Sequence, residues 1–246
     1  MEVHAHAHTP RKKWTHYFWE FLMLFLAVFC GFLAEYQLEH KIENDRERQY
    51  MKSMVEDLHY DTAALTESYS FAKTQLEKED SLIDMIWNNA VTRENISSIY
   101  LLHYKTSRSI GVDFEKRTAT QLMNSGGMRL VHDDDVADSI LSYWKEVKSL
   151  EFINSLVEDV GEKIADLGVK IFDSKYIIPG EKPLSPPQGT RPGIAFITNE
   201  SALFAEYGNR QYMRRRRVHN YITRMALAKE TATRLMSIIK NAYHLQ

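Results

Sequence analysis

The stretch YFWEFLMLFLAVFCGFLAEY, residues 17–36, decides the architecture of this chain. Every residue from Phe21 to Ala34 is apolar or glycine. Three aromatic residues precede this run, and only Glu20 separates them from it. A helix needs roughly 20 mostly apolar residues to cross about 30 Å of hydrocarbon. The uninterrupted run is shorter than this, so its flanking residues matter. Together with them, residues 17–36 predict a single transmembrane helix near the start of the chain.

Amphipathic aromatic rings flank the apolar run on both sides. Trp14, Tyr17 and Trp19 precede it and Tyr36 follows it, and such rings are enriched at the two membrane interfaces. Glu20 would lie about one turn inside the first interface. An acid at this depth is either a functional group within the membrane or an interfacial carboxylate satisfied by water or a basic neighbour. We therefore keep Glu20 as a candidate interaction residue.

Positive charge lies on the N-terminal side of the segment. Arg11, Lys12 and Lys13 precede it, whereas acidic residues dominate the first turns after Tyr36. The positive-inside rule therefore predicts that residues 1–16 form a short cytoplasmic tail and that the rest of the chain is exported. In a bacterium, this orientation places the C-terminal domain in the periplasm.

The sequence disfavours cleavage of the segment. Signal peptidase needs small residues at its site, and FLAEY at residues 32–36 offers a poor one. A lipoprotein signal would use Cys30, but the bulky Phe29 stands directly before it. A buried core helix is a further alternative, although such an aromatic run is unusual in a soluble core. We expect an uncleaved anchor in the inner membrane, in contact with membrane lipid.

The rest of the chain predicts an all-α protein. Only 10 glycines and 6 prolines occur in 246 residues, which disfavours barrels and solenoids, and apolar residues recur at steps of three and four. No proline or glycine occurs between Phe32 and Val91, so one helix can run from the membrane to Asn88, with a break near residues 57–62 left open. The expected parts are a transmembrane helix at 17–36, a charged stalk helix at 37–57, a helical bundle at 58–178, a Pro-rich loop at 179–193, and a basic amphipathic helix at 194–246 that packs back on the bundle or stalk.

Local signals predict the first short helices of the bundle. One begins near Ile96, and a second is expected over residues 114–125. The glycine pair at 126–127 is typical of a left-handed C-terminal cap. Residues 128–131 are expected to form a brief extended link.

A long amphipathic helix is expected next. The three aspartates at 133–135 favour its N-terminus by capping and by their charge, an interpretation we prefer to a calcium site. Its apolar seam alternates steps of four and three from Val136 to Ile171. Gly161 and Gly168 occupy positions on this seam, which implies either a close approach of helices or a kink.

The closing helix is expected from Ser201 to Tyr243, with Lys229 as the one intruder in its apolar alternation. It is strongly basic from its middle onward. Its four consecutive arginines are candidate interaction residues: Arg214, Arg215, Arg216 and Arg217. They can pair with the acidic stalk or another subunit, or meet lipid headgroups or a protein partner. Nucleic acid is disfavoured because the chain is expected to be exported and lacks a recognition pattern.

No common catalytic or cofactor-binding motif is present. The sequence has no phosphate loop, no Rossmann glycine triplet, no HExxH and no nucleophile elbow. Cys30, the single cysteine, lies in the expected membrane span and is no solvent-facing nucleophile. The alternating His4, His6 and His8 would bind a divalent metal weakly, and a solvated terminus is the simpler interpretation. We expect no enzyme activity, no cofactor and no metal site.

Three segments carry a resemblance: RKKWTHYFWEFLMLFLAVFCGFLAE (residues 11–35), EHKIENDRERQYMKSMVEDL (39–58) and TATQLMNSGGMRLVHDDDVADSILSYW (118–144). In these segments the chain resembles a Bacteroidota family of single-pass, N-terminally anchored membrane proteins with an exported helical domain, whose function is unknown. The resemblance implies a cell-envelope location and supplies no catalytic residues. The arginine run and the Pro-rich loop are not part of the resembling pattern.

These expectations lead to hypotheses from different classes. The first is a non-enzymatic, membrane-anchored periplasmic scaffold, adaptor or accessory subunit of an envelope complex, which forms a homo-oligomer or binds another envelope protein. The alternative is a periplasmic ligand-sensing module. It would signal through a separate cytoplasmic or membrane partner, because residues 1–16 leave no room for an output domain. An envelope enzyme is the third hypothesis.

Overall fold

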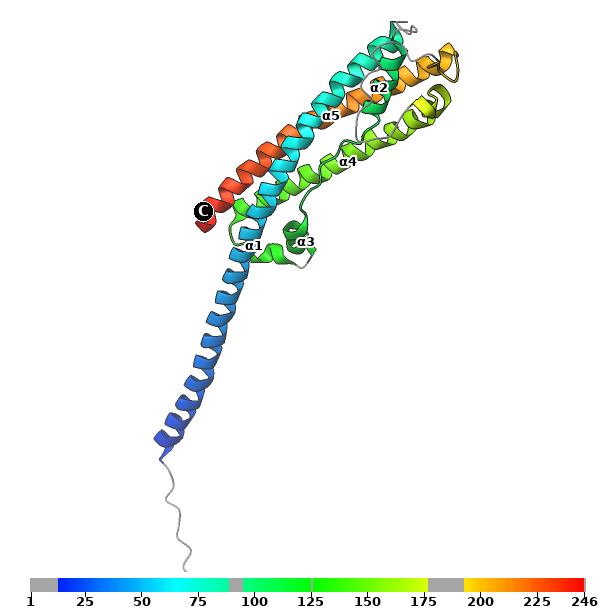
Figure 1. Cartoon of the computed structure of the whole chain (residues 1–246). Coiled ribbons are helices and arrows are strands. Elements are labelled where there is room, and N and C mark those ends of the chain that lie inside the picture. The colour runs from blue at the N-terminus through cyan, green and yellow to red at the C-terminus, as the bar shows by residue number, and fades with distance from the viewer. Residues whose placement is uncertain (1–12, 89–94, 125, 177–192, 246) are drawn as a thin grey trace, which may run out of the picture. The chain divides into compact units, whose positions relative to one another are not determined.

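The computed structural model describes residues 13–88, 95–124, 126–176 and 193–245. Within these ranges it contains five α-helices and no strand, so the all-α prediction is confirmed. The helices are α1 (Trp14–Trp87), α2 (Ile96–Thr106), α3 (Arg117–Asn124), α4 (Asp134–Ile171) and α5 (Ser201–Tyr243). Two short 3₁₀ turns complete the described elements: η1 (Gly127–Leu130) and η2 (Ser174–Tyr176) (Figure 1).

The chain divides into two compact units, with the boundary between Gln49 and Tyr50. We call residues 13–49 the N-terminal unit and residues 50–245 the helical domain. The N-terminal unit is made of the first part of α1. Among the described helices, α1 is the one long and apolar enough to cross a membrane, and its apolar window is not buried at all. This exposure distinguishes the window from the core helix of a soluble domain.

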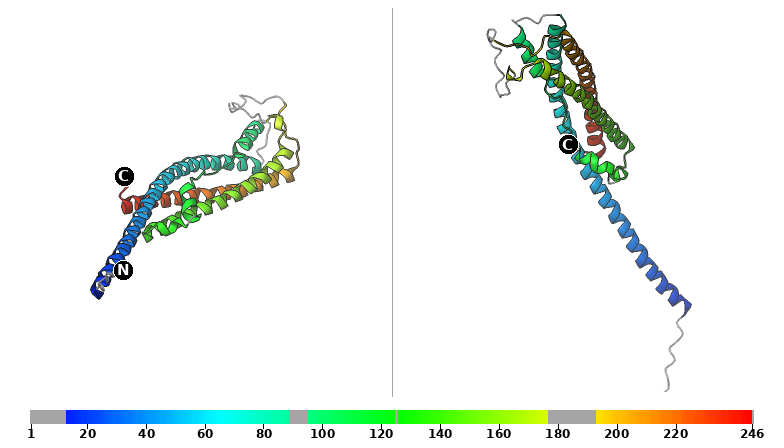
Figure 2. Two further views of the ribbon diagram at one scale, coloured as in Figure 1. Left: turned by 90° about the horizontal axis from the view of Figure 1, so that it is seen from below. Right: turned by 90° about the vertical axis from the view of Figure 1, so that its right-hand side faces the viewer.

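Three long helices build the helical domain: α1 from Tyr50 onward, α4 and α5. Figures 1 and 2 show α4 and α5 side by side and antiparallel. Buried residues recur every seven positions on each helix, the spacing of helices that pack along a seam. They are Leu58, Leu65 and Ala72 on α1, Val136, Tyr143, Leu150 and Val157 on α4, and Val218, Met225, Ala232 and Ile239 on α5.

An extended connection, residues 107–116, joins the end of α2 to the start of α3, and we call it the strap (Figure 1). Polar side chains on the inner face of α1 hold it. Ser68 Oγ donates a hydrogen bond to the carbonyl of Gly111 at 2.6 Å. Asp61 Oδ1 accepts one from the backbone amide of Glu115 at 2.7 Å. The strap therefore packs on the bundle as part of the domain.

The core begins earlier than predicted. The charged composition of residues 37–57 predicted a stalk, but Met51, Met54 and Val55 are buried in the helical domain. Met51 lies seven residues before Leu58 and so occupies the same helix face. The helix α1 also continues through residues 57–62, so it has no break there.

The short elements follow the prediction in part. The expected extended link at 128–131 is wrong over most of its length, because Gly127–Leu130 forms η1. Gly126 has a left-handed φ of 68°, as expected for a C-terminal cap. The helix before it begins at Arg117, later than the predicted residue 114.

The two long C-terminal helices match their predicted bounds closely. Asp133 caps α4, because its Oδ1 accepts a hydrogen bond from the backbone amide of Val136 at 3.0 Å. On α5 the buried stripe passes through Ala228, so Lys229 stands beside the seam and does not interrupt it. The predicted Pro-rich loop, except for Gly193, lies outside the described residues.

Candidate functional site

The candidate residues of the N-terminal unit lie on the exposed surface of α1. The four aromatic rings are each more than half exposed: Trp14, Tyr17, Trp19 and Tyr36. Glu20 lies one turn from His16, with its Oε1 3.0 Å from the Nε2 of the imidazole. His16 is therefore a side chain that Glu20 contacts in the structure. Lys13 is exposed, and Arg11 and Lys12 lie outside the described residues.

The four consecutive arginines of α5 occupy different environments. Arg215 Nη2 donates a hydrogen bond to Asp80 Oδ2 of α1 at 3.1 Å. Arg217 Nη1 lies 3.6 Å from Asp159 Oδ2 of α4. Arg216 is exposed. The acids that contact the run thus belong to the bundle and not to the predicted stalk.

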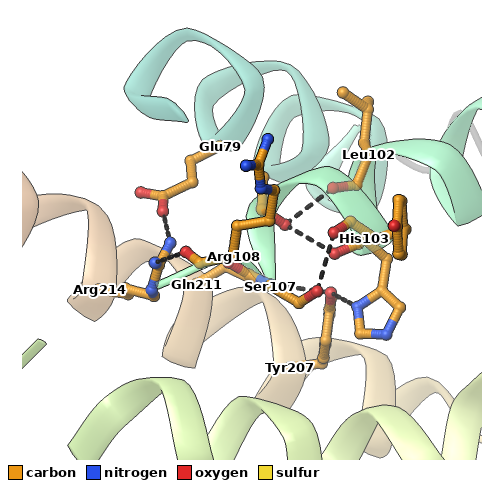
Figure 3. A network of polar contacts seen from close by, with 10 residues as sticks. Glu79, Leu102, His103, Ser107, Arg108, Tyr207, Gln211 and Arg214 are labelled. Carbon is orange, nitrogen blue, oxygen red and sulfur yellow. Dashed lines mark hydrogen bonds and ion pairs between the residues drawn. The ribbon is translucent and has the colours of Figure 1, made fainter. Parts of the chain in front are cut away.

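Arg214, the first of the run, is buried in the bundle. Its Nη1 pairs with Glu79 Oε1 of α1, and its Nη2 donates a hydrogen bond to the carbonyl of Arg108 in the strap at 3.1 Å (Figure 3). The Arg214 side chain is 4% exposed and that of Glu79 is 0% exposed. Burial lowers the pKa of Arg214 to about 10, so the guanidinium stays charged at neutral pH. One side chain therefore joins α5, α1 and the strap.

A layer of buried polar side chains separates two apolar clusters of the domain. One cluster includes Ala72 of α1, and the other includes Leu82. The buried polar side chains between them form what we call the polar layer: Gln75, Glu79, Gln211 and Arg214. Both amide atoms of Gln75, Glu79 Oε2 and Gln211 Oε1 have no hydrogen-bond partner within the described part of the chain. Buried polar groups are nearly always paired, so apolar packing alone does not explain this layer.

A chain of hydrogen bonds leads from the polar layer to His103 of α2. Gln211 Nε2 donates to Tyr207 Oη at 2.8 Å, and Tyr207 Oη lies 2.7 Å from His103 Nδ1 (Figure 3). Burial lowers the pKa of His103 to about 4. The imidazole is therefore neutral and carries one ring proton. Because Tyr207 Oη already accepts from Gln211, we assign its hydroxyl as the donor to His103 Nδ1, which places the ring proton on Nε2.

At Gly168 the structure distinguishes between the two alternatives, a close approach of helices and a kink. The helix α4 is continuous from Asp134 to Ile171. A Cβ atom on Gly168 would lie 2.9 Å from Cε1 of His103, whose ring stacks on Phe172 with centroids 4.0 Å apart. The missing side chain therefore permits a close approach of the His103 ring.

Arg214 of the polar layer also lines a cavity of about 350 Å³. The cavity lies among the end of α2, the first residues of the strap, α4 and α5. Ile164 and Phe172 contribute apolar wall, and Gly161 lies beside Arg214. The other polar groups at the cavity include His103, Ser107, Ser109, Glu158 and Glu162. Donors and carboxylates thus converge on one small space.

Two aspartates of α1 form a second buried polar cluster at the other end of the strap. Asp57 accepts hydrogen bonds from Arg117 Nη2 at 2.8 Å and from the backbone amide of Thr118 at 3.1 Å, so it caps the N-terminus of α3. Asp61 accepts one from Tyr143 Oη at 2.6 Å. Burial raises the pKa of Asp61 to about 6, although the Tyr143 hydrogen bond opposes the shift. These carboxylates serve to hold the strap and α3.

Sequence reasoning missed the polar layer. Its residues on α1 carry a detectable signal, because Glu79 follows Ala72 by seven positions and so falls on the buried seam. Gln75 and Asp61 lie on the same face. A polar residue on an apolar seam is an informative exception. On α5 the same signal marks Gln211, which precedes the seam residue Val218 by seven positions. No sequence pattern joins Gln211 to Tyr207 and His103 in one network.

A metal site is a separate question. Among the residues that the structure describes, no group of three or more His, Cys, Asp or Glu side chains is arranged to hold a metal ion. His4, His6 and His8 lie outside those residues.

Comparison with known proteins yields no relative. No family model, no curated protein and no solved structure matches this chain.

Proposed function

We propose that this chain is a non-enzymatic, membrane-anchored scaffold, adaptor or accessory subunit of a cell-envelope complex. Residues 1–16 would lie in the cytoplasm, and the helical domain would lie in the periplasm. The observation that carries the proposal is the composition of α1. The same helix contains an exposed apolar window and, from Met51 onward, a buried seam of the bundle. A domain built on such a helix would hold whatever it binds near the membrane.

The contacts of the buried carboxylates support a binding role for the domain over a catalytic role. Asp57 and Asp61 hold the strap and α3, and Glu79 is paired with Arg214. Carboxylates engaged in this way are committed to the fold. They are poorly suited to act as general bases, which must be free to take a proton from a substrate.

Exposed apolar side chains on α4 support a protein partner. Leu141 and Phe152 are 47% and 63% exposed, and about three helical turns separate them, so they lie on one side of α4. An exposed apolar side chain gains free energy when a partner removes it from water, so Leu141 and Phe152 are the contact points that we assign to a partner. We propose a second copy of the chain or another envelope protein as the partner, and membership of the Bacteroidota family described above is part of this proposal.

Crosslinking in native membranes tests the partner. A photoreactive phenylalanine analogue in place of Phe152 should give an adduct of higher mass that mass spectrometry identifies. The same analogue in place of Glu67, an exposed residue of α1, controls for random collision. A chain that gives no adduct above this control at any exposed α4 position would contradict the scaffold proposal.

Cysteine labelling tests the orientation. In a Cys30→Ser background, a single cysteine at Glu67 should react with a membrane-impermeant maleimide when only the outer membrane is permeabilised. Reaction only after lysis of the inner membrane would show that the helical domain is cytoplasmic.

A ligand-sensing module is the second candidate function. The cavity of about 350 Å³ and the unpaired polar atoms of Gln75 and Glu79 favour it. These two residues belong to α1, the helix that also contains the apolar window. Arg214 lines the cavity and pairs with Glu79, so a ligand bound in the cavity would act on α1 through Arg214. Its signal would need a separate partner.

A further inference from the structure

The cavity beside Arg214 has the size of a site for a small molecule. Its volume is about 350 Å³, near the lower end of the roughly 300–1,000 Å³ typical of ligand pockets. Such a volume suits a compact organic molecule.

One wall offers hydrogen-bond donors. Two nitrogens of the Arg214 guanidinium are engaged, one with Glu79 and one with the carbonyl of Arg108. The third nitrogen is Nε. It lies 4.0 Å from the position that a Cβ atom on Gly161 would occupy, and it is the atom nearest to that position. Because Gly161 has no side chain, that residue leaves Nε uncovered where both residues line the cavity. A carboxylate can accept a charge-assisted hydrogen bond there.

His103 of α2 adds a second hydrogen-bond donor to the cavity wall. Its Nδ1 is engaged with Tyr207, which leaves the proton on Nε2. His103 lines the cavity beside Gly168, seven residues after Gly161 on α4. The neutral ring can donate to a ligand oxygen without adding a charge to the site.

Another part of the wall carries negative charge. Glu158 and Glu162 both line the cavity from α4, and Glu158 Oε2 accepts a hydrogen bond from Ser109 Oγ at 3.1 Å. A carboxylate can hold a ligand ammonium group by a charge-assisted hydrogen bond. Ile164 and Phe172 supply the apolar surface between these polar groups.

We propose that this cavity binds a small zwitterion of the α-amino-acid type, with its carboxylate at Arg214 and His103 and its ammonium group at Glu158 and Glu162. Arg214 also contacts Glu79 of α1 and the strap. A bound ligand would therefore contact α5 directly at Arg214 and act through this residue on α1 and the strap. This inference goes beyond the scaffold proposal and does not depend on it. If the chain is a ligand-sensing module, the same inference names the class of ligand.

The direct test is ligand binding by the full chain in lipid nanodiscs. Each of the twenty proteinogenic amino acids at millimolar concentration is screened for a rise in the unfolding temperature, and the dissociation constant of any hit is measured by calorimetry. We expect at least one amino acid to raise the unfolding temperature in a concentration-dependent manner. The absence of any rise across the twenty would overturn the proposal.

Variants locate the site. Gly161→Leu fills the space in front of Arg214 Nε, and Glu158→Gln removes one partner of the ammonium group. Each should weaken binding at least tenfold while the unliganded protein keeps its helical circular dichroism. Asp166→Asn, at an exposed acid of α4 outside the cavity, should bind as the parent does. Equal affinity in the parent and in both cavity variants would place the ligand elsewhere.

Modified ligands test the zwitterion itself. The methyl ester and the N-acetyl derivative of the amino acid that binds best should each lose at least tenfold in affinity. If the N-acetyl derivative bound as well as the parent amino acid, the assignment of the ammonium group to Glu158 and Glu162 would be wrong. Crosslinking at Phe152 is unaffected by these outcomes, so failure of this inference is distinct from failure of the scaffold proposal.

Discussion

Arg214 of α5 and Glu79 of α1 form an ion pair inside the bundle, where neither side chain is more than 4% exposed. The pair lies in a layer that separates the two apolar clusters. Removing two charges from water is costly, and the attraction between them offsets this cost only in part. Such a pair adds little net stability, but it penalises any arrangement that separates its partners.

This energetic asymmetry predicts the behaviour of variants. Arg214→Met leaves Glu79 buried without its partner and should lower the free energy of unfolding by about 3–5 kcal/mol. The double variant Glu79→Met with Arg214→Met should recover most of this loss. Urea unfolding followed by circular dichroism measures both. Arg216→Met, at the exposed arginine of the run, should change stability by no more than about 0.5 kcal/mol. A double variant as unstable as Arg214→Met would refute this account.

Asp61 predicts a dependence of stability on pH. Burial raises its pKa in the folded state from 3.8 to about 6, so the folded chain favours the protonated acid more than the unfolded chain does. The contribution of Asp61 to the free energy of unfolding should therefore fall as pH rises from about 4 to about 6, by at most about 3 kcal/mol. Asp61→Asn should flatten this part of the profile. Asp138→Asn, at an exposed acid of α4, should leave the slope unchanged.

The glycines of α4 give a matched pair of substitutions. A Cβ on Gly168 would lie 2.9 Å from His103 Cε1, whereas the nearest atom to a Cβ on Gly161 is 4.0 Å away. Gly168→Ala should destabilise the domain by about 1–3 kcal/mol, because the His103 ring is held by Tyr207 and Phe172 and cannot shift freely. Gly161→Ala should stabilise it by up to about 1 kcal/mol through helix propensity. Thermal unfolding of the two variants checks the difference, and equal effects would contradict the assigned close approach.

The strength of each local pattern explains how much of the fold was predictable. Val136, Tyr143 and Leu150 lie seven residues apart on α4, and the caps at Asp133 and Gly126 are local signals. Such patterns need no knowledge of other segments, so the long helices and their ends were recovered. The end of the predicted stalk was placed too late because charged neighbours surround Met51, although Met51 lies on the same helix face as Leu58.

The candidate site was far less predictable, for a physical reason. Arg214 contacts Glu79 and Arg108, which are 135 and 106 positions away in the chain. The strap that completes the cavity has no periodic pattern of its own. Whether a seam glycine marks a kink or a close approach depends on the residue that packs against it. For Gly168 that residue is His103, which lies on another helix.

The apolar window of α1 gives a prediction about membrane association. Arginine near the middle of a membrane-spanning helix costs about 2.5–3.5 kcal/mol per residue on insertion scales, so Leu26→Arg with Phe29→Arg should move most of the chain from the membrane pellet to the supernatant after an alkaline wash. Leu38→Arg with Ile42→Arg provides a matched control, because both residues are exposed on α1 and follow the apolar run. The control should stay in the pellet. If the two double variants partition equally, the window at residues 17–36 is not what holds the chain to the membrane.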